Sequence, residues 1–454
     1  MPSSTMRIAA MGALCALITG GGAFADSQLL GTKLTPMGAD PSASVDGVIP
    51  AWTGGFTTPP AAYMPGQPHI DPFADDERLF TISHENLNEY AERLPATQIE
   101  LLTKFAGKYV LNVYPTRRSC AFPDSVYAAN KRNADKAQLV KGGVGFTNAW
   151  GGVAFPVPQN ADEVLWNFKT HFNGRRYSAK ITGGNMYENG VFTRIVREDK
   201  RYSFYYDPQT TSSADLKNSL FIWMGVWSAP PAVNGSGFSM TNTIDQIAQP
   251  RPGFMFSPDT RKIVRPVPNA TSYEAPMMTG DGLRIADDMM LFSGSQDRYN
   301  WKMIGKKTLY IPYNVYRATD PATGIENLVK RDFLNPEFIR YELHRVWVIE
   351  GILKPEFSHR YVRRVMYFDE DTWIAVGTDL YDEKGTLTHG QIGFIKNYYE
   401  YPACIQDFDI KYDLVQGRYN IDNLKIEFGP ANLDDERISS RSFGSAALKR
   451  AVGR

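Results

Sequence analysis

From Arg175 to Phe428, short strand-like runs alternate with turn signals, and this pattern constrains the fold more than any other feature. Clusters of acidic residues or glycine, such as 369–371, 382–385 and 416–417, separate the later runs. Short strands at this spacing predict an antiparallel meander. Its predicted strands are Phe338–Leu353, Arg360–Phe368, Thr372–Tyr381, Leu387–Lys396, Cys404–Leu414 and Tyr419–Phe428.

The first part of the strand region predicts tight turns and one strand that is buried on both faces. Tyr177–Ile181 alternates between apolar and polar residues, and Gly183-Gly184-Asn185 is predicted to turn the chain. We expect Val191–Val196 and Arg201–Tyr206 to form a hairpin. Leu220–Trp227 is almost continuously apolar, as in a strand with both faces covered.

A loop rich in glycine and aspartate joins this region to two aromatic runs, Tyr299–Ile304 and Lys307–Tyr313. Only Gly305-Lys306 separates the two runs, which predicts a second hairpin. The loop contains the pair Asp287-Asp288, followed directly by Met289-Met290. Flexible thioethers adapt to varied apolar partners, so the methionines are candidates for ligand contact, and ordinary loop-to-core packing is the favoured alternative.

The N-terminal part of the chain predicts export followed by an irregular arm. Met1–Ala25 has one basic residue, a short apolar run and a small-x-small cleavage site, which is typical of a secretory signal peptide. Residues 26–71 are rich in Gly, Pro, Ser and Thr and lack both the helical and the strand period. We expect residues 72–454 to form a single domain, with the mature protein in the periplasm.

Four helices are predicted before the strands and one after them. The first covers His84–Arg93, and the second begins at Thr97, where Glu100 completes a capping box. Pro123–Val140 is the third, and Asn160 begins the fourth. A short helix is expected near Ala446–Ala451. The predicted fold is therefore mainly β, of the α+β class: a large, curved antiparallel sheet that forms an unclosed half-barrel, with helices on its concave face.

Composition excludes one class of partner and leaves the state of the cysteines open. The chain has 49 basic and 49 acidic residues, whereas a nucleic-acid surface normally needs a basic excess. After signal cleavage only Cys120 and Cys404 remain. In an oxidising compartment they can form a disulfide, and the alternative is two separate buried thiols.

The sequence contains no pattern for catalysis or for metal binding. The six histidines form no ligand-spaced pair, and no nucleophile elbow or phosphate loop is present. We expect the acids of 369–371 to be solvated in a hairpin turn. A hydrolase based on Asp287 or Asp288 would need a base and a nucleophile that the sequence does not reveal. The prediction is a protein without catalytic residues, metal or cofactor.

Five segments carry a resemblance to a known family: LGTKLTPMGADPSASVDGVIPAWTGG, NVYPTRRSCAFPDSVY, GGVAFPVP, DGLRIADDMMLFSGSQDRYNWKMIGKKTLYIPYN, and ELHRVWVIEGILKP with MYFDEDTW. Together they resemble the domain-of-unknown-function 1329 family across nearly all of the mature chain. The resemblance implies a periplasmic protein of Gram-negative bacteria with a half-barrel similar to the outer-membrane lipoprotein carriers (the LolA/LolB-like superfamily). It further implies an outer-membrane protein and an exporter of the resistance-nodulation-division type as partners. It carries over neither catalytic residues nor a disulfide.

Two functions remain open from the sequence. The leading hypothesis is a periplasmic carrier or adaptor that binds a hydrophobic, lipid-like molecule inside the curved sheet, for transfer between an inner-membrane exporter and the outer membrane. The alternative is a non-catalytic assembly protein with a filled core and no ligand of its own. The candidate ligand-binding residues are Trp166, Phe168, Phe221, Trp223, Met289, Met290, Tyr310 and Tyr313.

Overall fold

The computed structural model describes residues 26–266 and 274–453. The predicted signal peptide lies outside the described residues. The α-helices are α1 (Asp26–Leu29), α2 (Leu87–Tyr90), α3 (Ala96–Lys104), α4 (Asp124–Lys136), α5 (Ala161–Thr170), α6 (Ile325–Leu328) and α7 (Ser445–Val452). Single-turn 3₁₀ helices lie between them, among them η1 (Ala91–Arg93) and η4 (Ala286–Leu291). Among the helices in these ranges, none combines the length and the apolar character needed to cross a bilayer.

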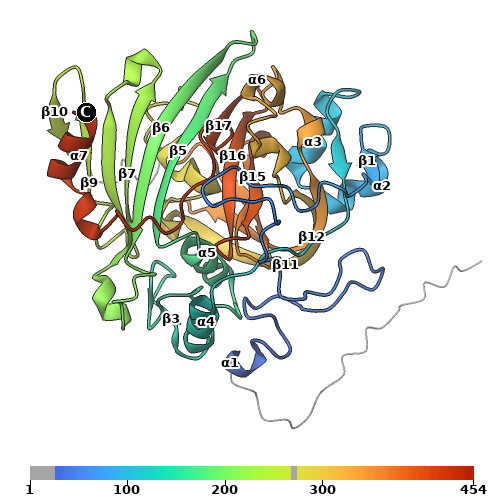
Figure 1. The fold of residues 1–454 in the computed structure, drawn as a ribbon, viewed down its shortest axis with the longest axis horizontal. Helices are drawn as coiled ribbons and strands as arrows, with labels where there is room; N and C mark the ends of the chain where they lie inside the picture. The colour runs from blue at the N-terminus through green and yellow to red at the C-terminus, as the bar shows by residue number, and fades with distance from the viewer. Residues whose placement is uncertain (1–25, 267–273, 454) are drawn as a thin grey trace, which may run out of the picture.

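One large sheet dominates the molecule, and its two end strands do not pair with each other in the described ranges. Its strand order is β1-β2-β12-β13-β14-β15-β16-β17-β5-β6-β7-β8-β9-β10, and β11 pairs with β12 beside β2 (Figure 1). All pairings in the sheet are antiparallel except the single bridge between β12 and β2. Its strands are β1 (Phe80–Ile82), β2 (Leu111–Val113), β5 (Arg176–Met186), β6 (Phe192–Ser203), β7 (Ser219–Ala229), β8 (Gly237–Thr243), β9 (Gly253–Ser257), β10 (Lys262–Val264), β11 (Tyr299–Pro312), β12 (Tyr341–Leu353), β13 (Arg363–Asp369), β14 (Ala375–Tyr381), β15 (Leu387–Tyr398), β16 (Ala403–Asp413) and β17 (Arg418–Leu424).

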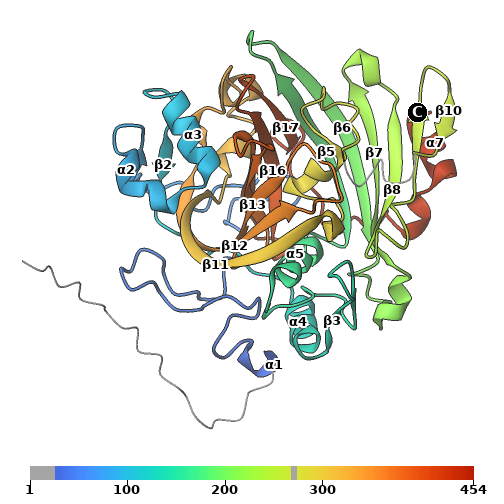
Figure 2. The same cartoon turned by 180° about the vertical axis from the view of Figure 1, so that it is seen from behind.

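The predicted half-barrel is confirmed, because the sheet curves strongly and stays open between β1 and β10. Figure 2 shows β11 and β12 curling round one side, while β5–β10 form a flatter wall on the other. The C-terminal meander is also confirmed, since β12 to β17 pair in sequence order. A separate two-stranded sheet, β3 (Gln138–Leu139) with β4 (Phe146–Thr147), lies beside α4.

Three predicted turns are wrong, because the chain continues through each of them as a strand. Gly183-Gly184-Asn185 lies inside β5, and the predicted hairpin of residues 191–206 is the single strand β6 followed by a turn. The predicted hairpin at Gly305-Lys306 is also a single strand, β11, which pairs with β12 along its length. Gly305 has φ of +121° and marks a bulge after Met303, so this glycine bends the strand without reversing it.

The helices divide between the two faces of the sheet. Helix α5 lies at the base of the trough between the two halves of the sheet (Figures 1 and 2) and buries Val164, Leu165 and Phe168 in the main apolar core. Helix α3 packs on the opposite face, where Thr97 donates to Asp379 of β14. Helix α7 also packs on that opposite face, against the outer side of β7–β9. We call the face that carries α5 the inner face.

A local sequence signal explains the start of α5, and the cap predicted for α3 is wrong. Asn160 caps α5 by accepting a hydrogen bond from the Glu163 backbone N–H, as predicted. Thr97 does not begin α3, because the helix starts at Ala96 with Pro95 at the N-cap and the Thr97 hydroxyl bonds the buried Asp379. The predicted C-terminal helix is confirmed as α7.

The residues before β1 form an irregular segment that is fastened to the C-terminal strands. Between α1 and β1 the described chain contains no regular helix or strand. His69 lies against Glu400 at 2.9 Å, and Phe56 packs edge-on against Tyr399. Further along the chain, Cys120 and Cys404 form a disulfide between two segments 284 residues apart.

Candidate ligand cavity

A cavity of about 90 Å³ lies on the inner face, between the wall β5–β8, strands β16 and β17, and the methionine loop after Asp288. Alternation along β7 places Phe221 and Trp223 on this side, while Ile222 and Met224 face α7. Met240 of β8 lies directly opposite Trp223 in the sheet. The remaining lining residues are His171, Asn173, Tyr177, Asp199, Arg201, Asn242, Arg251, Met289, Met290, Ser293, Ile405, Gln406, Asp422, Asn423 and Lys425.

A strained loop presents the two methionines to the cavity. Met290 and Leu291 have φ values of +52° and +73°, in the left-handed region that non-glycine residues rarely adopt. Their conformation is maintained by buried neighbours, because Asp287 and Asp288 directly precede them and are fixed inside the sheet. Strain of this kind costs about 1–3 kcal/mol for each residue and persists only where the surroundings enforce it.

Ion pairs anchor both carboxylates of the Asp287-Asp288 pair. Asp287 accepts from Arg364 at 2.8 Å and lies 3.1 Å from the His359 ring nitrogen. Asp288 accepts from Lys411 and from the Ile285 backbone. Burial raises the pKa of the Asp287 carboxyl, but Arg364 and His359 outweigh burial and bring the pKa to about 2. The cavity lining includes the methionines and neither carboxylate, so the geometry supports an anchoring role for the pair.

The charged side chains on the polar side of the cavity differ in their partners. Asp199 accepts two hydrogen bonds from Arg197, at 2.8 and 2.9 Å, and Asp422 lies 3.3 Å from the same guanidinium. Lys425 lies 3.4 Å from Asp407. Arg201 donates to the Asn173 carbonyl, and in residues 26–266 and 274–453 it has no carboxylate within ion-pair distance.

A second, smaller cavity of about 40 Å³ adjoins the first and shares Phe221 and Met290 with it. Phe168 and Lys169 of α5 line this second space. The Lys169 ammonium donates to the Gly294 carbonyl at 2.9 Å and lies over the Phe292 ring. Burial lowers its pKa to about 7. Because Met290 borders both cavities, rotation of its flexible side chain can join them.

The structure brings five of the eight predicted ligand-binding residues to the two adjoining cavities. Phe221, Trp223, Met289 and Met290 line the main cavity, and Phe168 lines the adjoining one. The other three lie elsewhere: Trp166 donates to the Gly143 carbonyl and packs on Phe146, Tyr310 packs edge-on against Phe80, and Tyr313 stacks on His344.

Arg201 lines the cavity and was missed because the charged residues before it look like a turn. The charged run 197–201 interrupts the apolar pattern of β6, although its odd-numbered residues all face inward. Arg201 belongs to this run, and two other lining residues, Tyr177 and Met240, lie on β5 and β8. Alternation extended through the charges would have placed Arg197, Asp199 and Arg201 on one face.

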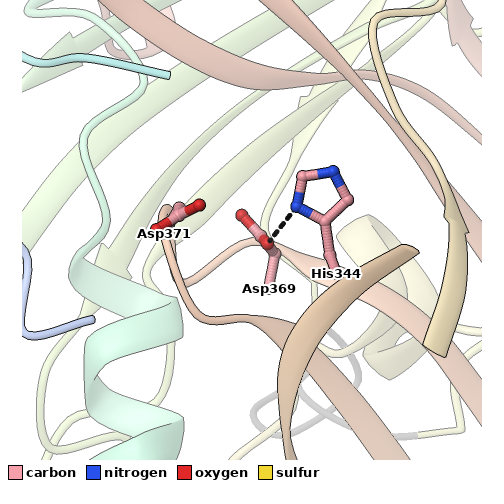
Figure 3. Close-up of side chains that lie close together, drawn as sticks. All are labelled: His344, Asp369 and Asp371. Carbon is pink, nitrogen blue, oxygen red and sulfur yellow. Dashed lines mark ion pairs between the residues drawn. The ribbon is translucent and has the colours of Figure 1, made fainter. Parts of the chain in front are cut away.

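The acids of 369–371 are buried, which corrects the expectation that they are solvated. Arg118, which leads into the disulfide segment, covers this hairpin and donates to both oxygens of Asp371. Asp369 and Asp371 meet His344 there, with ligand atoms within 4.8 Å of one another (Figure 3). Burial and the Asp371 charge raise the pKa of Asp369 to about 7. Since Arg118 already occupies both Asp371 oxygens, we assign no metal to this cluster.

With this geometry established, comparison with known proteins identifies the family. The family model described as "Protein of unknown function (DUF1329)" matches residues 81–449. The chain belongs to the DUF1329 family. It is 34% identical over 425 residues to an uncharacterised protein of Pseudomonas aeruginosa, an alignment that covers 94% of this chain and 93% of that protein.

Solved structures with a related outline include three bacterial proteins. A DUF1329 family protein from Desulfovibrio piger has 13% identity and a TM-score of 0.42, covering 63% of this chain and 96% of that one. A putative outer membrane lipoprotein-sorting protein domain from Vibrio parahaemolyticus has 15% identity and a TM-score of 0.41, covering 63% and 97%. A LolA superfamily protein from Nitrosomonas europaea has 11% identity and a TM-score of 0.37, covering 64% and 99%. We draw no functional conclusion from these scores.

Proposed function

We propose that this DUF1329 protein is a non-catalytic periplasmic carrier or adaptor that binds a hydrophobic, lipid-like molecule in the inner-face cavity. The proposal rests on the side chains that line this cavity. Two aromatic side chains of β7 and two methionines from a strained loop converge on an open space inside the sheet. Binding sites for small apolar ligands are concave, mostly apolar and supplied with a few polar groups.

The volume of the cavity limits how much of a ligand it can hold. About 90 Å³ holds several waters, because one water needs about 10–15 Å³ on the same measure. A long acyl chain needs more room, which movement of Met289 and Met290 supplies by opening the adjoining cavity. Each CH₂ that leaves water contributes about 0.8 kcal/mol, so a chain of modest length binds without any chemistry.

Transfer between an exporter of the inner membrane and the outer membrane is the role we propose for the bound form. The predicted signal peptide of Met1–Ala25 supports the compartment. The protein would take up an amphiphile on one side of the periplasm and release it on the other, with an outer-membrane protein or an exporter of the resistance-nodulation-division type as partner.

The alternative, an assembly protein without a ligand, is favoured by the filling of the rest of the inner face. Leu309, Val348 and Phe368 all pack into one core with α5, and none of the three lines the cavity. Such a protein would use its sheet edges and loops to contact its partners.

Titration of a fluorescent fatty-acid analogue into the purified mature protein separates the two functions. Met240→Trp fills the cavity and should weaken binding at least about tenfold, because the chain is displaced from apolar surface. Lys180→Trp, on the exposed face of β5, is the matched control and should bind as the parent does. Saturable binding that Met240→Trp leaves unchanged would reject the cavity as the site, and absence of binding to the parent would favour the alternative.

A further inference from the structure

We infer that the amphiphile carries an anionic head group, a carboxylate or a phosphate, which binds to Arg201 at the base of the cavity; this rests on the proposed function. The inference begins from an imbalance of charge. Arg201 is 8% exposed and lines the cavity, yet in the described part of the chain no carboxylate lies within 4.0 Å of its nitrogens. A buried cation without a counter-ion is costly, so such a group usually has a partner.

The nearby acids are already committed to other cations. Asp199, two residues before Arg201 on the same face of β6, accepts hydrogen bonds from two nitrogens of the Arg197 guanidinium. Asp422 shares that guanidinium. Lys425, which also lines the cavity, has Asp407. An incoming anion can therefore neutralise Arg201 without breaking any of these ion pairs.

Aromatic packing holds the Arg201 guanidinium in a fixed place. Its centre lies 5.1 Å from the Tyr177 ring and 5.6 Å from the Phe221 ring. One of its nitrogens donates to the Asn173 carbonyl, which fixes the orientation of the planar group. A fixed guanidinium presents parallel N–H donors that match the oxygens of a carboxylate or a phosphate.

The positive charge of Arg201 affects His171, which also lines the cavity. Burial and the Arg201 charge lower the pKa of His171 to about 4, so this imidazole is neutral near pH 7. Its Nδ1 contacts the Phe168 carbonyl. The Arg201 guanidinium therefore supplies positive charge at this end of the cavity. Burial also lowers the pKa of Arg201 to about 10, which leaves it charged at neutral pH.

The strand register places the head and the chain of the ligand. Trp223 lies directly opposite Arg201 in the β6–β7 pairing, and Met240 lies opposite Trp223 in the β7–β8 pairing. A ligand with its head at Arg201 therefore extends along an apolar path across β7 and β8, with Met289 and Met290 covering it from the loop side. A cationic or uncharged head would leave the guanidinium desolvated and without a partner.

Calorimetric titration with four amphiphiles of one chain length tests the head group. Dodecanoate and dodecyl phosphate should bind at least about tenfold more tightly than dodecanol, because a hydrogen bond to a charged group adds to the shared apolar contact. Dodecyltrimethylammonium should bind no better than dodecanol. The two anions also tell whether carboxylate or phosphate is preferred.

Substitution at Arg201 then assigns the preference to this residue. Arg201→Gln should lose the tenfold preference for anions, while its affinity for dodecanol stays within about threefold of the parent's. Arg201→Lys should keep part of the preference for anions, because lysine has the positive charge but lacks the two parallel N–H donors of arginine. Arg441→Gln, at an exposed arginine before α7, is the charge-matched control. Circular dichroism confirms that each variant is folded. Equal binding of dodecanoate and dodecanol by the parent overturns the head-group inference but leaves the carrier proposal intact, and a preference that survives Arg201→Gln overturns the role of Arg201. Failure of all four to bind rejects both.

Discussion

Removal of the Cys120–Cys404 disulfide should strongly destabilise the fold, because the bond closes a very long loop of the chain. The two cysteines are 284 residues apart, and their Cα atoms lie 5.5 Å from each other. In the chain-entropy model a loop of this length restricts the unfolded state by about 5–6 kcal/mol at 25 °C, and measured losses for native disulfides are about 2–5 kcal/mol. We therefore expect Cys120→Ala to lower the free energy of unfolding by about 2–5 kcal/mol.

The pattern among variants is more decisive than the size of any single loss. Cys120→Ala, Cys404→Ala and the double variant each remove the same bond, so their free energies of unfolding should agree within about 1 kcal/mol. Urea denaturation followed by circular dichroism measures the loss, and a thiol titration of the unfolded parent under oxidising conditions should find no free thiol. Additive losses of the two single variants, or a double variant as stable as the parent, would refute the reasoning.

Three further predictions concern buried charges and backbone strain. Lys169→Met should remove a pH dependence of stability. The lysine has a pKa of about 7 in the folded protein and about 10.4 in the unfolded chain, so between these pH values the unfolded state binds the extra proton and the stability of the parent rises with pH between 7 and 10, by up to about 1.4 kcal/mol per pH unit. In urea denaturation Lys169→Met should lack this rise, whereas the control Lys449→Met should keep it. Arg364→Met should lower the free energy of unfolding by about 3–5 kcal/mol in the same assay, because the buried Asp287 carboxylate loses its ion-pair partner. Adding Asp287→Asn should recover part of this loss. Full stability of the single variant would contradict the anchoring role. Gly305→Val should lower the thermal midpoint, at a cost of about 1–3 kcal/mol, because φ of +121° is strained for a side chain; an unchanged midpoint would mean that the bulge relaxes freely.

The sequence was sufficient for the open sheet because its turns lie between apolar strands. In the C-terminal meander, clusters such as 382–385 end one strand and begin the next, as the residues suggest. The turns predicted at glycines were wrong elsewhere. Gly183 and Gly184 lie in a paired strand, and Gly305 forms a bulge that is recognised only from its pairing with β12. A single sequence does not distinguish a bulge from a reversal, because both need the same backbone freedom.

The candidate site was harder to predict because it depends on which charges pair inside the sheet. The charged residues of β6 resemble a solvated turn until Arg197 is seen to neutralise Asp199. The acids of 369–371 are buried for a similar reason, since Arg118 reaches them from a segment more than two hundred residues away. Aromatic residues on α5 and β7 were equally attractive from sequence, yet Trp166 packs in the core while Trp223 faces the cavity.

Native mass spectrometry of the protein, purified without detergent from its own host, tests the central claim most directly. If the inner-face cavity holds a lipid-like cargo, part of the protein should carry one added molecule, and collisional release should yield an anionic amphiphile. Met240→Trp protein prepared in the same way should lack the added mass. A parent protein that carries no added mass, and that gains none after incubation with dodecanoate or dodecyl phosphate, would contradict the account.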